Sequence, residues 1–231
     1  MPFALQNVEV TYGDRKVLTI ERLTITPGMI TAIMGPNGAG KTTLLKVFAG
    51  LLPLAQGSLS YQGETVTAHS VPRLRQNVSL VHQAPLLFDT TVVENVAFGL
   101  KARGVPKHEI QQKMTWALSV VGCSDLANRR ARELSGGEVK RVAIARALAL
   151  EPAVLLLDEP LADVDQTTAQ ALEQIFRGSE ARGQTLIFST HDPRLARRLA
   201  QDVVILRQGR LSASSHENPS ANHLLVDGET P

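Results

Sequence analysis

The segment Gly35–Thr42, which reads GPNGAGKT, constrains the fold of this chain more than any other stretch. It matches the pattern G-x-x-x-x-G-K-[ST], in which glycines let backbone N–H groups curl around phosphate oxygens and the following helix points its positive end at the same anion. Lys41 adds a mobile positive charge for the phosphates, and the hydroxyl of Thr42 can bind Mg²⁺. An apolar run, Met29–Met34, precedes the loop, so the sequence predicts a strand, a phosphate-binding loop and a helix in succession.

Four short apolar runs have the character of buried strands, and turn residues or helix-forming segments follow them. These runs are Met29–Met34, Val154–Leu157, Thr185–Phe188 and Val203–Leu206. Continuous apolar runs of this length suit central strands covered on both faces, and strands that alternate with helices indicate an α/β sheet. We therefore expect an α/β fold with a mostly parallel sheet.

The stretch between Gln83 and Leu150 differs, because its segments favour helix and none favours strand. We interpret the whole chain, 1–231, as one domain with a helical insertion. Its predicted parts are an α/β core at 1–83 and 151–211, a helical subdomain at 84–150 and a C-terminal tail at 212–231. Met114, Trp116 and Leu118 are expected to pack in the core of the helical part.

The composition argues against several functional classes. The net charge of +2 is too small to indicate nucleic acid as the main partner, which would require a concentrated basic face. No run of about 18 apolar residues occurs, and the first residues lack the pattern of a signal peptide. If the protein serves a membrane, we expect it to do so through a partner.

A pair of acidic residues follows the apolar run Val154–Leu157. A carboxylate at the end of a buried strand can hold the Mg²⁺ shell, which fits Asp158. The next carboxylate, Glu159, can accept a proton from an attacking water. Together with the phosphate-binding loop, this pair indicates a nucleoside triphosphate, Mg²⁺ and hydrolysis.

A second glycine-rich helix start lies at Glu133–Arg141, which reads ELSGGEVKR. Ser135 and Glu138 form the pattern of a capping box, which explains the serine and the glutamate. It leaves Gly136 and Gly137 unexplained, since glycine within a helix costs roughly 1 kcal/mol relative to alanine. Glycine suits a backbone that something must approach closely, and at a helix N-terminus an anion fits best. We therefore predict a second phosphate-binding helix start.

These motifs, in this order, resemble the ATP-binding-cassette (ABC) ATPases, the nucleotide-binding subunits of transporters. The likeness covers about residues 3 to 211 and rests on GPNGAGKT, the glutamine of VHQ, LSGGE, LLLDEP, LADVD and the histidine of STHD. It implies a P-loop NTPase core with a mostly parallel sheet, N-terminal antiparallel strands and an inserted α-helical subdomain. It also implies an ATPase whose hydrolysis drives transport, with ATP and Mg²⁺ as cofactors.

The resemblance also implies a role for individual residues. Tyr12 would stack on adenine, and Gln83 would contact Mg²⁺ and the attacking water. Glu159 would be the general base, and His191 would contact the γ-phosphate. The residues implied to hold phosphates or Mg²⁺ are Gly35, Asn37, Gly38, Ala39, Gly40, Lys41, Thr42, Thr43 and Asp158, with Ser135, Gly136 and Gly137 acting on ATP held by another subunit.

The family works as a head-to-tail dimer with two ATP molecules at the interface, so the resemblance implies a second copy of this chain as a partner, with Asp165 at the interface. It further implies an integral membrane permease, contacted by Leu86, Leu87 or Phe88, and indirectly a solute-binding protein, but no nucleic acid. We expect a cytoplasmic location, peripheral on the inner face of the membrane. The loop after Gln83 and the ending HLLVDGE resemble tungstate- and phosphate-type importers, which suggests an oxyanion such as tungstate, phosphate or molybdate.

Several alternatives stay open at this point. The cassette could serve an exporter, DNA repair or chromosome structure, although repair cassettes carry long coiled coils between the two glycine-rich motifs. Ribosome-binding members carry two cassettes in one chain. A P-loop kinase would leave LSGGE and His191 without a role. Departures from the family pattern at His82, Lys140 and Asp163 leave the tuning of the interface and of the rate open.

Overall fold

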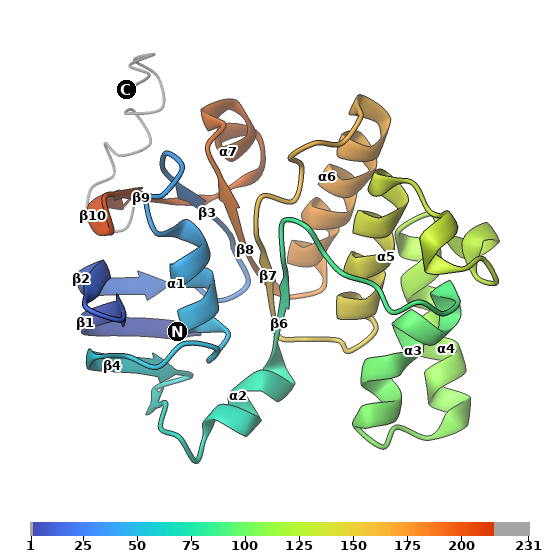
Figure 1. The fold of residues 1–231 in the computed structure, drawn as a ribbon, viewed down its shortest axis with the longest axis horizontal. Coiled ribbons are helices and arrows are strands. Elements are labelled where there is room, and N and C mark those ends of the chain that lie inside the picture. The colour runs from blue at the N-terminus through green and yellow to red at the C-terminus, as the bar shows by residue number, and fades with distance from the viewer. Residues whose placement is uncertain (1, 215–231) are drawn as a thin grey trace.

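The computed structural model describes residues 2–214, which form one continuous mixed sheet covered by helices (Figure 1). Its strands are β1 (Phe3–Tyr12), β2 (Arg15–Ile25), β3 (Ile30–Met34), β4 (Gln56–Tyr61), β5 (Glu64–Thr65), β6 (Val78–Val81), β7 (Val154–Leu157), β8 (Thr185–Thr190), β9 (Asp202–Arg207) and β10 (Arg210–Ser214). Its α-helices are α1 (Lys41–Phe48), α2 (Val71–Asn77), α3 (Val92–Ala102), α4 (Lys107–Val120), α5 (Gly136–Leu148), α6 (Gln166–Ala181) and α7 (Pro193–Leu199). The strand order is β5-β4-β1-β2-β10-β9-β3-β8-β7-β6.

The strands β9, β3, β8, β7 and β6 form the parallel part of the sheet. Every residue of β3, β7 and β8 is buried, which is why these strands read as largely apolar runs. Alternate residues face two cores: one contains side chains of α3 to α7, and the other contains side chains of α1, β1 and β2. The carboxyl ends of these strands, where ligands bind in open α/β sheets, carry the motifs discussed below.

The N-terminal strands form the antiparallel part. β1 pairs antiparallel with both β2 and β4, and β10 joins this part to the parallel strands by pairing with β2 and β9. The predicted fold class is therefore confirmed: a mostly parallel α/β sheet carries antiparallel strands at its N-terminal edge. β6, which the sequence analysis did not anticipate, forms the opposite edge.

The segment between β6 and β7 contains α3, α4 and α5, and the only strand-like pairing described within it is the isolated bridge between Thr91 and Arg130. Met114 and Leu118 of α4 are buried as expected, whereas Trp116 is 38% exposed. The expectation for Trp116 was wrong because a spacing of two residues rotates a side chain by about 200° around a helix.

β10 extends to Ser214, so the first residues of the predicted tail lie in a strand; residues 215–231, including HLLVDGE, lie outside the described residues. Within residues 2–214, no helix is both long enough and apolar enough to cross a bilayer.

Candidate nucleotide-binding and hydrolysis site

The glycine-rich loop lies between β3 and α1, at the carboxyl end of the parallel strands. At two positions it requires glycine. A Cβ atom on Gly35 would lie 2.3 Å from the carbonyl oxygen of Leu206, and Gly40, at φ +100°, would place a Cβ atom 3.2 Å from the Leu18 side chain. No side chain caps the N-terminus of α1. Its first N–H groups are therefore available to an anion.

Lys41 is buried at the start of α1, and its ammonium group points back into the loop. Its Nζ donates hydrogen bonds to the carbonyl oxygens of Gly35, at 2.8 Å, and Pro36, at 3.3 Å. It also lies 3.2 Å from Oε1 of Glu159, with both side chains nearly buried. The loop, its lysine and the predicted base thus form one cluster.

Thr42 and Asp158 meet across 116 residues of sequence. The Thr42 hydroxyl donates to Oδ2 of Asp158 at 2.8 Å, and the Asp158 N–H donates to the carbonyl oxygen of Val81 on the neighbouring strand at 2.9 Å. A hydroxyl and a carboxylate are hard oxygen donors of the type that Mg²⁺ prefers. The pair therefore fits the predicted Mg²⁺ site.

Ser189, near the end of β8, joins the two acidic residues, and the sequence analysis did not single it out. Its hydroxyl donates to Oδ1 of Asp158 at 2.7 Å and accepts the backbone N–H of Glu159 at 2.8 Å. The side chain is fully buried. The signal that could have identified it is a serine directly after the apolar run that ends at Phe188, on the strand next to the acidic pair.

The carboxylate of Glu159 contacts two side chains, the ammonium group of Lys41 and the imidazole of His191. His191 follows β8, and its Nδ1 lies 3.3 Å from the Glu159 carboxylate. The histidine is 61% exposed, whereas Glu159 is buried. Glu159 adopts φ +43°, a strained conformation for a residue other than glycine, and such strain clusters at functional sites.

In the part of the chain that the structure describes, no hydrogen bond or ion pair joins Gln83 or Tyr12 to this cluster. β6 pairs in parallel with β7, with Val81 opposite Leu157, so Gln83 and Glu159 each follow the end of adjacent strands. Gln83 is exposed. Tyr12 is 48% exposed at the turn of the β1–β2 hairpin. The rest of the loop is arranged as follows: Ala39 is buried, Thr43 is half-buried, and Asn37 and Gly38 are exposed.

Ser135 caps α5, away from the glycine-rich loop. The predicted capping box is present: the Glu138 N–H donates to the Ser135 hydroxyl at 3.3 Å, and the Ser135 N–H donates to the Glu138 carboxylate at 2.7 Å. In Figure 1, β8, β7 and α6 lie between α1 and α5. Among the described residues, no hydrogen bond or ion pair joins Ser135 to the loop.

The two glycines of this helix start differ. A Cβ atom on Gly136 would meet nothing within 4 Å, so this glycine leaves the helix end open to approach. A Cβ atom on Gly137 would lie 3.0 Å from the Thr168 hydroxyl. Gly137 therefore has a steric reason within its own chain, namely the close packing of α5 against the start of α6, which the sequence reasoning missed.

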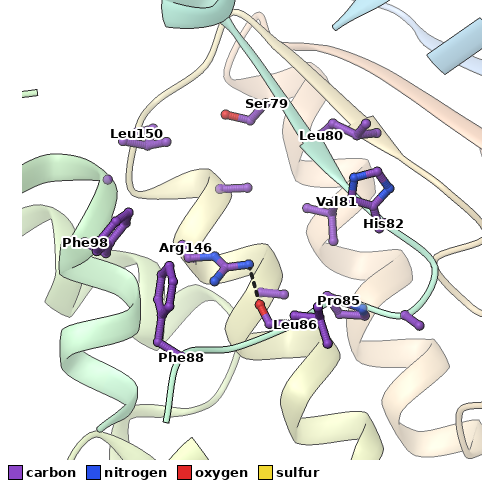
Figure 2. Close-up of a pocket in the computed structure, with 14 residues that line it drawn as sticks. Ser79, Leu80, Val81, His82, Pro85, Leu86, Phe88, Phe98, Arg146 and Leu150 are labelled. Atoms are coloured by element: carbon purple, nitrogen blue, oxygen red, sulfur yellow. Dashed lines mark hydrogen bonds between the residues drawn. The ribbon is translucent and has the colours of Figure 1, made fainter. Parts of the chain in front are cut away.

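A second surface lies on the helical side, where a pocket of ≈ 530 Å³ opens between the segment after β6, α3 and α5 (Figure 2). The rings of Phe88 and Phe98 lie 4.5 Å apart. Arg146 of α5 donates to the carbonyl oxygen of Leu86 at 3.0 Å, and its guanidinium lies 5.9 Å from the centre of the Phe88 ring. Leu86 is 86% exposed beside this pocket.

Comparison with known protein families matches residues 18–162, more than half of the chain, to the family described as ABC transporter. The chain is 38% identical, over 91% of its length and 97% of the other protein, to the tungstate uptake system ATP-binding protein TupC of Peptoclostridium acidaminophilum. It is also 38% identical, over 90% of its length, to the spermidine/putrescine import ATP-binding protein PotA of Haemophilus influenzae, of which it spans 56%.

Among solved structures, the chain resembles the ATP-binding cassette MJ0796, which was solved as a dimer in a post-hydrolysis state bound to ADP and Pi. The TM-score is 0.83 at 28% identity, over 92% of this chain and 97% of that one.

Proposed function

Because the chain belongs to the ABC transporter family and is one of its ATP-hydrolysing subunits, we propose that it binds MgATP in its glycine-rich loop, hydrolyses it with Glu159 as base, and thereby drives a membrane importer. The observation that carries this proposal is one connected cluster. Lys41 contacts Glu159, and Thr42 contacts Asp158. Ser189 joins the Asp158 carboxylate to the backbone N–H of Glu159, and His191 contacts the Glu159 carboxylate.

The proposed binding step uses the loop. Backbone N–H groups from Gly38 to Thr43 surround the phosphates, and Lys41 leaves its carbonyl partners to meet the β- and γ-phosphates. Tyr12 stacks on the adenine. Thr42, Asp158 and Gln83 would hold Mg²⁺, which neutralises charge on the phosphates when it is bound.

The proposed chemical step uses Glu159. Its carboxylate accepts a proton from water as the water oxygen attacks the γ-phosphorus and the bond to the β-phosphate oxygen breaks. The hydrogen bond from the Glu159 N–H to Ser189 fixes the backbone of the base. His191 lies beside the Glu159 carboxylate, and from there its imidazole would contact the γ-phosphate. Gln83 orients the attacking water.

The proposed partner of the site is a second copy of the chain. Because α5 lies apart from α1 (Figure 1), its N-terminal residues should bind no phosphate held by their own subunit. These residues are Ser135, Gly136 and Gly137. Two chains arranged head to tail bring Ser135 of each to the γ-phosphate held by the other, with Asp165 at the interface. This explains why one chain carries two glycine-rich helix starts.

The pocket beside Leu86 and Phe88 is the proposed contact with an integral membrane permease (Figure 2). Its exposed apolar side chains suit a partner that covers them. A solute-binding protein would act through that permease, and no nucleic acid is involved. We propose an oxyanion as solute class, since one relative, matched over 91% of this chain and 97% of its own length, is a tungstate uptake protein.

The substitution Glu159→Gln tests the proposed base. It should leave ATP binding intact and slow hydrolysis by roughly 10²–10⁴-fold, because glutamine accepts no proton at pH 7. It should also let an ATP-dependent dimer accumulate, measured by size-exclusion chromatography with and without ATP.

The matched control for this experiment is Glu173→Gln, which removes a carboxylate that pairs with Arg198 away from the site. The control should hydrolyse ATP at the parent rate. Hydrolysis by Glu159→Gln at the parent rate would exclude Glu159 as the base.

A further inference from the structure

One face of α5 packs against the segment that follows the proposed base. Gly137 and Lys140 lie three residues apart on this helix and so share a face. Gly137 approaches the side chain of Thr168, and the Nζ of Lys140 donates a hydrogen bond to the carbonyl oxygen of Ala162. Through Lys140, α5 thus contacts the loop after Glu159 within one chain.

That loop has an unusual backbone. The Ala162 N–H donates to the carbonyl oxygen of Glu159 at 3.2 Å, which closes a turn over residues 159–162. Glu159, which begins this turn, and Asp163, which follows it, have φ values of +43° and +58°. Residues other than glycine keep such conformations only where their surroundings hold them. Lys140 supplies one such contact, at the carbonyl group next to Asp163.

The charge of Lys140 suits this position. Partial burial lowers the pKa of its ammonium group, while the negative charges of Asp163 and Glu159 favour the protonated form. A charged ammonium group that donates to a carbonyl oxygen holds a turn more firmly than a neutral donor would.

We propose that Lys140 is a positioning residue for ATP hydrolysis: it fixes the turn from Glu159 to Asp163 on α5 and so holds the Glu159 carboxylate in place. The inference rests on the proposed role of Glu159 as base. It also gives α5 a second task, since a phosphate bound at Ser135 and the turn that carries Glu159 are then joined through one rigid helix.

The test is Lys140→Met, which keeps the length of the side chain and removes the donor and its charge. We expect kcat for ATP hydrolysis to fall roughly 10- to 100-fold, as misplacement of a catalytic group does, with the KM for ATP and the Tm close to the parent values. Lys140→Arg, which keeps a charged donor, should retain most of the activity.

The matched control is Lys113→Met. Lys113 pairs with Glu151 on the helical segment, away from the turn, so its loss should leave kcat unchanged. If Lys140→Met does not fold, Lys140→Gln, which keeps an N–H donor without the charge, takes its place.

The double variant Lys140→Met/Glu159→Gln separates this inference from the proposed function. If Lys140 acts through Glu159, adding Lys140→Met to Glu159→Gln should lower kcat no further. Parent-level hydrolysis by Glu159→Gln alone would refute the base assignment. Parent-level kcat in Lys140→Met, a fall in activity matched by a fall in Tm, or full additivity in the double variant would overturn the positioning role.

Discussion

At the scale of single residues, Ser189 shows how one buried hydroxyl organises the site. It donates to Asp158 and accepts from the N–H of Glu159, so both of its hydrogen-bonding functions are used. Thr31, on the neighbouring strand β3, is equally buried, yet its hydroxyl oxygen has no hydrogen-bond partner within residues 2–214. The Ser189 hydroxyl should therefore stabilise the folded state, whereas burial of the Thr31 hydroxyl should destabilise it.

The variants Ser189→Ala and Thr31→Val test this contrast. Ser189→Ala should lower the free energy of unfolding by about 1–3 kcal/mol, because it leaves the Glu159 N–H buried without a partner. Thr31→Val should be neutral or stabilising, since it replaces an unsatisfied hydroxyl with a methyl group. Urea denaturation measures both, and equal destabilisation by the two changes would refute the assignment.

The motif residues could be predicted from sequence because each motif is local. The loop with Lys41 and Thr42, and the pair Asp158 and Glu159, are read from a few adjacent letters. Ser189 could not be predicted in this way, because its role arises from the register of β7 and β8. The steric reason for Gly137 was missed on the same ground, since it depends on how α5 packs against Thr168.

At the scale of elements, the start of α5 combines two requirements. The capping box between Ser135 and Glu138 fixes where the helix begins, and the open position at Gly136 leaves its end accessible. The N–H of Ser135 holds the pKa of Glu138 below its usual value. The charged carboxylate therefore stabilises the folded helix end.

This pKa shift predicts a pH-dependent effect of Glu138→Gln. Because the pKa is lowered on folding, the carboxylate contributes its full stability above its unfolded pKa of about 4.5 and loses it as the pH falls through the lower folded value. Glu138→Gln should therefore be less stable than the parent at pH 7, and the difference should shrink below pH 4.5. Denaturation curves at several pH values measure this, and a constant difference would contradict it.

The elements differ in how far the sequence predicted them. The runs that became β3, β7, β8 and β9 were recognisable because central parallel strands are buried on both faces and read as continuous apolar stretches. β6 has only four residues, one of them Ser79, and its edge position left no comparable signal. The antiparallel hairpin β1–β2 was expected from the family resemblance rather than from its pattern.

At the scale of the whole molecule, one chain carries two glycine-rich helix starts, at α1 and at α5. The cluster around Lys41 and Glu159 lies at the end of the parallel strands, while Ser135 caps α5. In Figure 1, β8, β7 and α6 lie between α1 and α5. A solved relative is a dimer bound to ADP and Pi. We propose that Ser135 acts on ATP held by a second copy of the chain.

Mixing two inactive variants, Lys41→Ala and Ser135→Arg, tests this claim most directly. Each homodimer has one defect in both of its sites, so neither variant should hydrolyse ATP alone. A head-to-tail heterodimer has one site with both defects and one intact site, with Lys41 from the Ser135→Arg chain and Ser135 from the Lys41→Ala chain. ATP hydrolysis should therefore reappear on mixing. Hydrolysis that stays at the level of the separate variants, or a Ser135→Arg chain that is fully active alone, would contradict this claim.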